Sequence, residues 1–175
     1  MKKTFKIPMS FKTLYTRAYA MLEEVTPIKA DCGQLCGAAC CRVEEEITGM
    51  YLFPEENVMF RDMPSYAKLY DTDFEYDYGR YADLFTCDGS CERWRRPLAC
   101  RIFPLLPYCH EGEEPKIIMD PRGRGLCPLA QTMEAEELDP EFVEAVEKVT
   151  GLIMKNAQIR QFIYALSDQI DGMKL

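Results

Sequence analysis

The spacing of apolar residues predicts amphipathic helices at both ends of the chain. Apolar side chains recur at helical intervals over residues 11–25, and Ser10 supplies a hydroxyl as a candidate N-cap. Residues 139–171 begin with Asp-Pro, an N-cap and first-turn pair, and carry two further apolar stripes. Gly151 lies between these stripes, so we expect it to separate two helices in a helical C-terminal segment.

The middle of the chain carries a different pattern. Residues 54–63 open with Pro-Glu-Glu, which favours a helix start. Residues 73–78 alternate acidic and aromatic side chains, which predicts a half-buried strand with its acids in solvent. Residues 102–108 contain two prolines and are expected to be extended, and after a turn at 111–115 the chain returns as a strand at 116–119. The fold class predicted is α+β, mostly α-helical, with short strands and a hairpin.

Length and composition predict a single domain over residues 1–175. A chain of this size with 47% hydrophobic residues can build its own core. The basic start resembles a signal peptide, but Lys6, Pro8 and Lys12 interrupt its apolar stretch, and no window is long enough to span a membrane. We therefore expect a cytoplasmic protein with no membrane partner. The net charge of −8 argues against a nucleic-acid partner.

The most informative chemistry lies in the cysteines. Eight of the nine fall into three blocks within a cysteine-rich module at about residues 30–130. Clustered thiolates in a reducing cell are typical of sites for zinc, iron or an iron–sulfur cluster, [4Fe-4S] included. The predicted metal ligands are Cys32, Cys36, Cys40, Cys41, Cys87, Cys91, Cys100 and Cys127.

Two other interpretations of the cysteines are less favoured. Disulfides fit poorly because the count is odd, the adjacent Cys40 and Cys41 cannot easily bridge to each other, and no export signal is visible. Burial as inert core thiols suits a single residue such as Cys109 but does not explain the clustering. Cys109 is therefore expected to lie outside the metal site, and His110 to be an ordinary residue of a surface turn.

Basic residues surround the later cysteines. Residues 93–124 carry seven bases against four acids, and six of the arginines flank Cys91, Cys100 and Cys127. Positive charge there would favour thiolates and offset an anionic metal–thiolate centre. Alternatively, these arginines pair with the acidic run 44–46 or with the acids near Asp73. The six arginines are Arg93, Arg95, Arg96, Arg101, Arg122 and Arg124.

Spacing alone does not fix the metal or the number of sites. Eight cysteines could form two four-ligand sites, or one such site with supporting thiols. Two Cys-x3-Cys pairs fit zinc-knuckle spacing loosely, whereas the tight ferredoxin run is absent. Glycines at 33 and 37 favour a loop entering a short helical turn over one continuous helix at the first block.

Several motifs together resemble one known family. These are CGQLCGAACC, the segment Leu52–Glu56, CDGSCERWRRPLACRIFP and a later Cys-Pro. The combination resembles the zinc- or iron-chelating domain family named for its CxxC…CC motif, although Cys32, Cys36 and Cys40 are spaced more widely than in its tightest members. The resemblance implies metal binding. The same cysteine pattern is distantly similar to part of the flagellin lysine N-methylases, which would imply methyl transfer.

Three functions remain open at this point. The first is a metal-binding protein that chelates zinc or iron through clustered thiolates. The second is a metal-dependent enzyme, such as a group transferase or a redox protein, although the chain lacks a glycine-rich nucleotide fingerprint. The third is an interaction module whose acidic face binds a basic protein partner.

Overall fold

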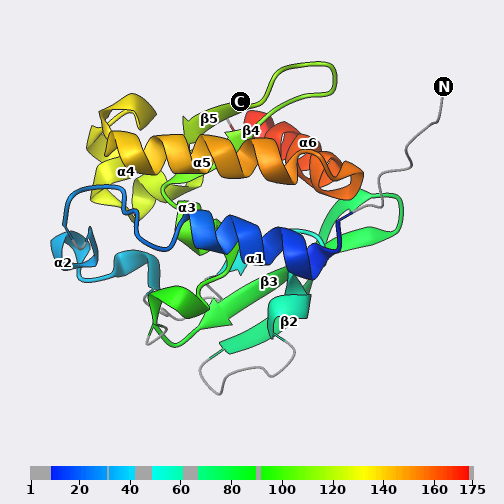
Figure 1. Ribbon diagram of the computed structural model, residues 1–175, viewed down its shortest axis with the longest axis horizontal. Coiled ribbons are helices and arrows are strands. Elements are labelled where there is room, and N and C mark those ends of the chain that lie inside the picture. The colour runs from blue at the N-terminus through cyan, green and yellow to red at the C-terminus, as the bar shows by residue number, and fades with distance from the viewer. Residues whose placement is uncertain (1–8, 31, 42–48, 61–66, 90–91, 174–175) are drawn as a thin grey trace.

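The computed structural model describes residues 9–30, 32–41, 49–60, 67–89 and 92–173. These residues form six α-helices, five β-strands and several 3-10 helices (Figure 1). The predicted α+β fold class, rich in helix with short strands, is confirmed. No helix among these described residues is long and apolar enough to cross a membrane.

Three longer helices form the helical part of the fold: α1 (Phe11–Met21), α5 (Pro140–Ile153) and α6 (Ala157–Gly172). Figure 1 shows α1 beside α5, with the hairpin of β2 (Ala67–Asp77) and β3 (Arg80–Cys87) on the opposite side of α1. The predicted N-cap of α1 is confirmed because the Ser10 hydroxyl accepts a hydrogen bond from the Thr13 amide. The helix ends earlier than the predicted residue 25.

The C-terminal segment forms two helices, but they do not separate at Gly151. Asp139 caps α5 by accepting a hydrogen bond from the Glu141 amide, as its sequence position predicts. The helix continues through Gly151, because the residues after it, Leu152 and Ile153, are buried in the core and hold the last turn in place. Packing of this kind outweighs the helix penalty of roughly 1 kcal/mol for one glycine. The break comes at Asn156, which caps α6.

Two antiparallel sheets carry the strands. The first has the order β1-β3-β2, from β1 (Met50–Tyr51), β2 (Ala67–Asp77) and β3 (Arg80–Cys87). The second is the hairpin of β4 (Leu105–Tyr108) and β5 (Lys116–Met119). Both the alternating strand at 73–78 and the later hairpin were predicted from sequence, and both are confirmed.

The alternating pattern of β2 separates a core face from a solvent face. Phe74 and Tyr76 are buried and meet the ring of Phe162 on α6 edge-on, at centroid distances of 5.8 and 5.5 Å. The acids Asp73 and Glu75 are exposed. The interpretation that the aromatic residues pack into the core, with the acids in solvent, is therefore confirmed for Phe74 and Tyr76, but it is wrong for Tyr78, which follows the strand and is 98% exposed.

The helix expected from residue 54 is short and of a different type. It is the 3-10 helix η2 (Glu56–Phe60), and residues 61–63 of the predicted range lie outside the described residues. Glu55 has a left-handed φ of 60°, which interrupts regular helix at this point. The turn directs Glu56 into the interior, where its side chain is fully buried.

Several short helical segments lie in the cysteine-rich module, beside the five strands. Its α-helices are α2 (Cys32–Cys36), α3 (Leu98–Ile102) and α4 (Pro128–Thr132). Its 3-10 helices are η1 (Ala39–Cys41), η3 (Arg93–Arg95) and η4 (Pro121–Gly125), and η5 (Ala135–Glu137) leads into α5. The chain therefore turns often between cysteines, which lets residues distant in sequence approach one another.

Candidate metal centre

The first cysteine block is a short helix followed by a tight turn. Cys32 and Cys36 lie at the two ends of α2, one helical turn apart, and the Cys36 thiol donates to the Cys32 carbonyl oxygen at 3.8 Å. Gly37 and Ala38 then adopt left-handed φ values of 58° and 56°, which ends the helix. Cys40 consequently does not continue the helical face of Cys32 and Cys36. The sequence predicted a loop that enters a short helical turn: one continuous helix is absent, as expected, but the block begins with helix α2, and Gly33 lies inside it.

Cys40 and Cys41 bring two thiols to ligand spacing. Their Sγ atoms lie 3.9 Å apart within η1. Two thiolates that share a tetrahedral metal at metal–sulfur distances of about 2.3 Å are separated by about 3.8 Å. The pair therefore fits two corners of a tetrahedral thiolate site without rearrangement.

Gly89 brings the second cysteine block against the first. It follows β3 and Cys87, and its φ is 82°. A Cβ atom at this position would lie 2.6 Å from the carbonyl oxygen of Cys41, so a larger residue cannot occupy it without a backbone shift. Backbone from both blocks therefore meets beside the Cys40–Cys41 pair.

The remaining predicted ligands occupy separate elements. Cys87 ends β3, Cys100 is half-buried in α3, and Cys127 is buried at the N-cap position of α4. Cys91 lies outside the described residues. Across the described ranges, no three cysteine, histidine, aspartate or glutamate side chains converge closely enough to hold a metal ion. The features that suit a metal site are thus the Cys40–Cys41 pair and the close approach of the two cysteine blocks.

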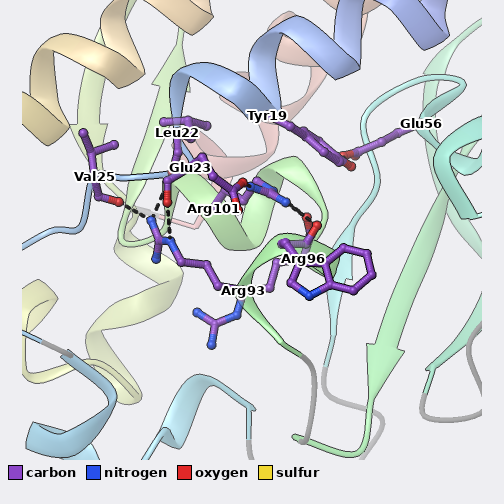
Figure 2. A network of polar contacts seen from close by, with 9 residues as sticks. Tyr19, Leu22, Glu23, Val25, Glu56, Arg93, Arg96 and Arg101 are labelled. Carbon is purple, nitrogen blue, oxygen red and sulfur yellow. Dashed lines mark hydrogen bonds and ion pairs between the residues drawn. The ribbon is translucent and has the colours of Figure 1, made fainter.

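Arg93 connects the end of α1 to the first cysteine block. Its guanidinium donates to the carbonyl oxygens of Leu22 at 3.2 Å and Glu23 at 3.3 Å, and also to that of Val25 (Figure 2). Leu22 is the C-cap residue of α1, and Glu23 and Val25 follow it, so these bonds hold the chain where the helix ends. Burial, and then the positive charges of neighbouring arginines, lower the pKa of Arg93, whereas the Cys32 thiolate opposes this shift. The Cys32 sulfur therefore lies within electrostatic reach of a cation.

Arg101 is a deeply buried charge near the cysteines, with 2% of its surface exposed. It donates to the carboxylate of Glu23 at 2.9 Å, to the carbonyl of Arg96 at 2.8 Å and to the carbonyl of Trp94. Its guanidinium carbon lies 4.3 Å from the ring centroid of Tyr19, a cation–π contact. The side-chain acceptor of Arg101 is thus a carboxylate, that of Glu23.

Glu56 completes this polar cluster from the other side of Tyr19 (Figure 2). Its Oε1 accepts hydrogen bonds from the Tyr19 hydroxyl and the Leu98 amide, both at 2.6 Å, and its Oε2 accepts one from the Phe53 amide at 3.0 Å. Burial raises the pKa of Glu56 to about 7, against the lowering effect of these donors. We call Glu56, Tyr19, Arg101 and Glu23 the Glu56–Arg101 network.

Two of the arginines that flank the cysteines form ion pairs within the described residues. Arg95 pairs with Glu92 at 3.4 Å, and Arg122 pairs with Asp120 at 2.7 Å, so each finds an acid close to it in the chain. The acidic run 44–46 lies outside the described residues. Arg93 and Arg101 donate hydrogen bonds to backbone carbonyl oxygens near the cysteines. Neither interpretation of the sequence predicted these bonds.

Cys109 and His110 directly follow β4, in the connection of the β4–β5 hairpin. Cys109 is 1% exposed in the core, and its thiol donates to the carbonyl oxygens of His110 and Glu113, both at 3.3 Å. The two ring nitrogens of His110 each lie 3.1 Å from a carboxylate of α6, those of Asp168 and Asp171. His110 thus fastens the β4–β5 hairpin to α6, a more specific role than that of an ordinary turn residue.

A cavity of about 530 Å³ opens beside Cys40. The three-stranded sheet contributes Tyr51, Asp71 and Asp73 to its walls, and η4 contributes Arg122. Its volume is in the range of small-molecule sites. The cavity lies between Cys40, a predicted metal ligand, and strand β2 with its acidic and aromatic residues.

Sequence reasoning missed the Glu56–Arg101 network as a unit. Tyr19 was part of an apolar helix stripe, and Glu56 was assigned to the first turn of a helix. The only signal for Glu56 was its place in the Leu52–Glu56 motif. Comparisons with protein-family models, with curated proteins and with solved structures find no match for this chain.

Proposed function

We propose that this protein binds zinc or iron, the latter as an ion or in an iron–sulfur cluster, through thiolates of its clustered cysteines. The proposed ligands are drawn from Cys32, Cys36, Cys40, Cys41, Cys87, Cys91, Cys100 and Cys127. The observation that carries the proposal is the 3.9 Å separation of the Cys40 and Cys41 sulfurs, which suits two corners of one tetrahedral site.

Two further features support the proposal. Gly89 allows the backbone of the second block to touch Cys41, so thiols from both blocks can contribute to one centre. Arg93 places a positive charge near Cys32, and a cation stabilises a thiolate against its thiol. Binding would deprotonate the ligand thiols, and loading should therefore release protons. Such thiols stay reduced in the cytoplasm, the compartment we propose for this protein.

The first test is elemental analysis of anaerobically purified protein together with its absorption spectrum. A stoichiometric, colourless zinc protein and a coloured iron–sulfur protein are the two expected outcomes. Replacing Cys40 and Cys41 together by serine should abolish metal content, and Cys100→Ser should lower it. Cys109→Ala is the matched control, since it removes a thiol outside the blocks. Protein that is free of metal when purified and takes up neither zinc nor iron would refute the proposal.

A second candidate function is metal-dependent catalysis, such as group transfer in the manner of the flagellin lysine N-methylases or redox chemistry. The cavity beside Cys40 favours it, because a site that only stores or structures a metal needs no adjoining space of this size. Its test is a cobalt-substituted protein, whose visible spectrum reports the ligands around the metal. An open coordination position filled by added ligands supports catalysis, whereas a closed four-thiolate spectrum argues against it.

A further inference from the structure

The strongest unexplained feature of the interior is a pair of buried charges beside Cys100. Glu56 is fully buried and Arg101 nearly so. Removing such groups from water costs several kcal/mol each, and apolar residues of similar volume often stabilise a core at least as well. Stability alone therefore accounts poorly for these charges. The backbone atoms that they contact suggest another role.

The Glu56–Arg101 network holds the chain on both sides of Cys100. On the N-terminal side, Oε1 of Glu56 accepts from the amide of Leu98, which is the first residue of α3. Arg101 follows Cys100 directly, and its guanidinium donates to the carbonyls of Trp94 and Arg96. Side chains of the network thus hydrogen-bond three backbone positions that precede Cys100, namely Trp94, Arg96 and Leu98.

The same network ties this segment to α1. The Tyr19 hydroxyl donates to Glu56 at 2.6 Å while its ring lies under the Arg101 guanidinium, and Glu23 accepts from Arg101 at 2.9 Å. Tyr19 thus contacts both buried charges. The end of α1 leads toward Cys32, and Arg93 holds the carbonyls at this end. The end of α1 and the residues that follow it are therefore bonded to Arg93 and Arg101, in the segment that carries Cys100.

We infer that Tyr19, Glu56 and Arg101 are positioning residues that hold the Cys100 thiol in place for the metal. This inference rests on the proposed function. Ligands that are ordered before binding lose less conformational entropy when the metal arrives. Loss of an outer hydrogen-bond partner of a metal ligand typically weakens metal affinity by about 10- to 100-fold.

Tyr19→Phe is the sharpest test, because it removes one hydroxyl and keeps the ring under Arg101. Tyr15→Phe is its matched control. Tyr15 lies on the same helix and also donates one hydrogen bond at 2.6 Å, but to the carbonyl of Pro54, and it is fully buried whereas Tyr19 is half-buried. A second pair is Glu56→Gln with the exposed neighbour Glu55→Gln as its control. Each pair makes the same chemical change inside and outside the network.

Two measurements are made on each variant of the full chain. Zinc affinity is measured by competition with a chelating dye, and the rate of iodoacetamide alkylation at Cys100 is measured in metal-free, reduced protein by mass spectrometry. We expect Tyr19→Phe and Glu56→Gln to weaken zinc binding by about tenfold and to speed alkylation of Cys100. The two controls should change neither quantity, although Tyr15→Phe should lower the melting temperature as much as Tyr19→Phe does.

The outcomes separate this inference from the function on which it rests. Wild-type protein that binds neither zinc nor iron would overturn the proposed function and the inference together. Wild-type protein that binds zinc, with Tyr19→Phe within twofold of Tyr15→Phe in both measurements, would overturn the inference alone. A shared loss of melting temperature without a difference in affinity would assign Tyr19 to stability only.

Discussion

The amide of Leu98 donates a 2.6 Å hydrogen bond to Oε1 of Glu56, across 42 positions in the chain. This bond joins the start of α3, which carries Cys100, to a carboxylate with no exposed surface. Glu56 consequently holds the start of α3 in place, and its negative charge is costly to bury. Its protonation should therefore be visible in the stability of the whole protein.

We predict that Glu56 makes the metal-free protein less stable as the pH rises from about 4.5 to about 7. Burial raises the pKa of Glu56 to about 7 in the folded state, above its ordinary value of 4.5. Between these values the folded protein binds the proton and the unfolded chain does not, so the free energy of unfolding falls as pH rises. This pKa difference between the folded and unfolded states corresponds to a loss of about 3 kcal/mol in the free energy of unfolding.

Urea unfolding of reduced, metal-free protein at pH 5 and pH 7.5 measures this effect. Glu56→Gln removes the titrating group, so its stability should depend less on pH than that of the wild type. Glu55→Gln, on an exposed side chain, should keep the wild-type dependence. Equal pH dependence in the wild type and Glu56→Gln would show that the buried carboxyl does not carry a raised pKa.

A second prediction concerns the contact between the two cysteine blocks. Gly89→Ala adds a Cβ atom 2.6 Å from the Cys41 carbonyl at a left-handed φ of 82°. Gly112→Ala has nearly the same φ, 84°, with no atom within 4 Å of the new Cβ. Thermal or urea unfolding should show a loss of roughly 1–2 kcal/mol for Gly112→Ala, from backbone strain alone.

Gly89→Ala should cost more than Gly112→Ala and should also weaken metal binding, because it separates backbone that belongs to both blocks. The comparison isolates the steric clash, since the two substitutions share the same backbone penalty. Equal losses of stability together with equal metal affinity would mean that the blocks do not need to touch at Gly89.

The third prediction separates a buried arginine from an exposed one. Arg101→Met fills a similar volume but leaves the carbonyls of Trp94 and Arg96 without their donor, and should lower the free energy of unfolding by roughly 2–4 kcal/mol. Arg95→Met removes an exposed ion pair with Glu92 and should cost at most about 1 kcal/mol. Chemical denaturation of both variants gives the comparison, and similar losses would contradict the importance assigned to the interior guanidinium.

The contrast between these residues shows where sequence reasoning succeeds. Periodicity located α1, the two C-terminal helices and the strand at 73–78, because local burial patterns and caps such as Ser10 and Asp139 decide those elements. Periodicity wrongly placed the helix break at Gly151. The packing of Leu152 and Ile153 keeps the helix intact there, and this packing is a tertiary effect that no local sequence pattern contains.

The candidate site was predictable in its chemistry and less so in its geometry. The spacing of the cysteines indicated that eight of them are metal ligands, and this stays a prediction. It also indicated that Cys109 lies outside the metal site. It could not identify the partners of Glu56, because Tyr19 and Leu98 lie 37 and 42 positions away and meet it only through the fold. Likewise the arginines were expected to meet acids or thiolates, but Arg93 meets the carbonyls of a helix end.

A last prediction uses the difference between Cys40 and Cys109. Cys40 is exposed, whereas Cys109 is 1% exposed, and burial together with the charge of Glu113 raises the pKa of the Cys109 thiol. Because the thiolate is the reactive form, Cys109 should react slowly with iodoacetamide in native, metal-free protein, and Cys40 should react rapidly. Adding zinc should protect Cys40 and leave the rate at Cys109 unchanged. Mass spectrometry of time-resolved samples measures both rates, and rapid alkylation of Cys40 at saturating zinc would exclude it as a ligand.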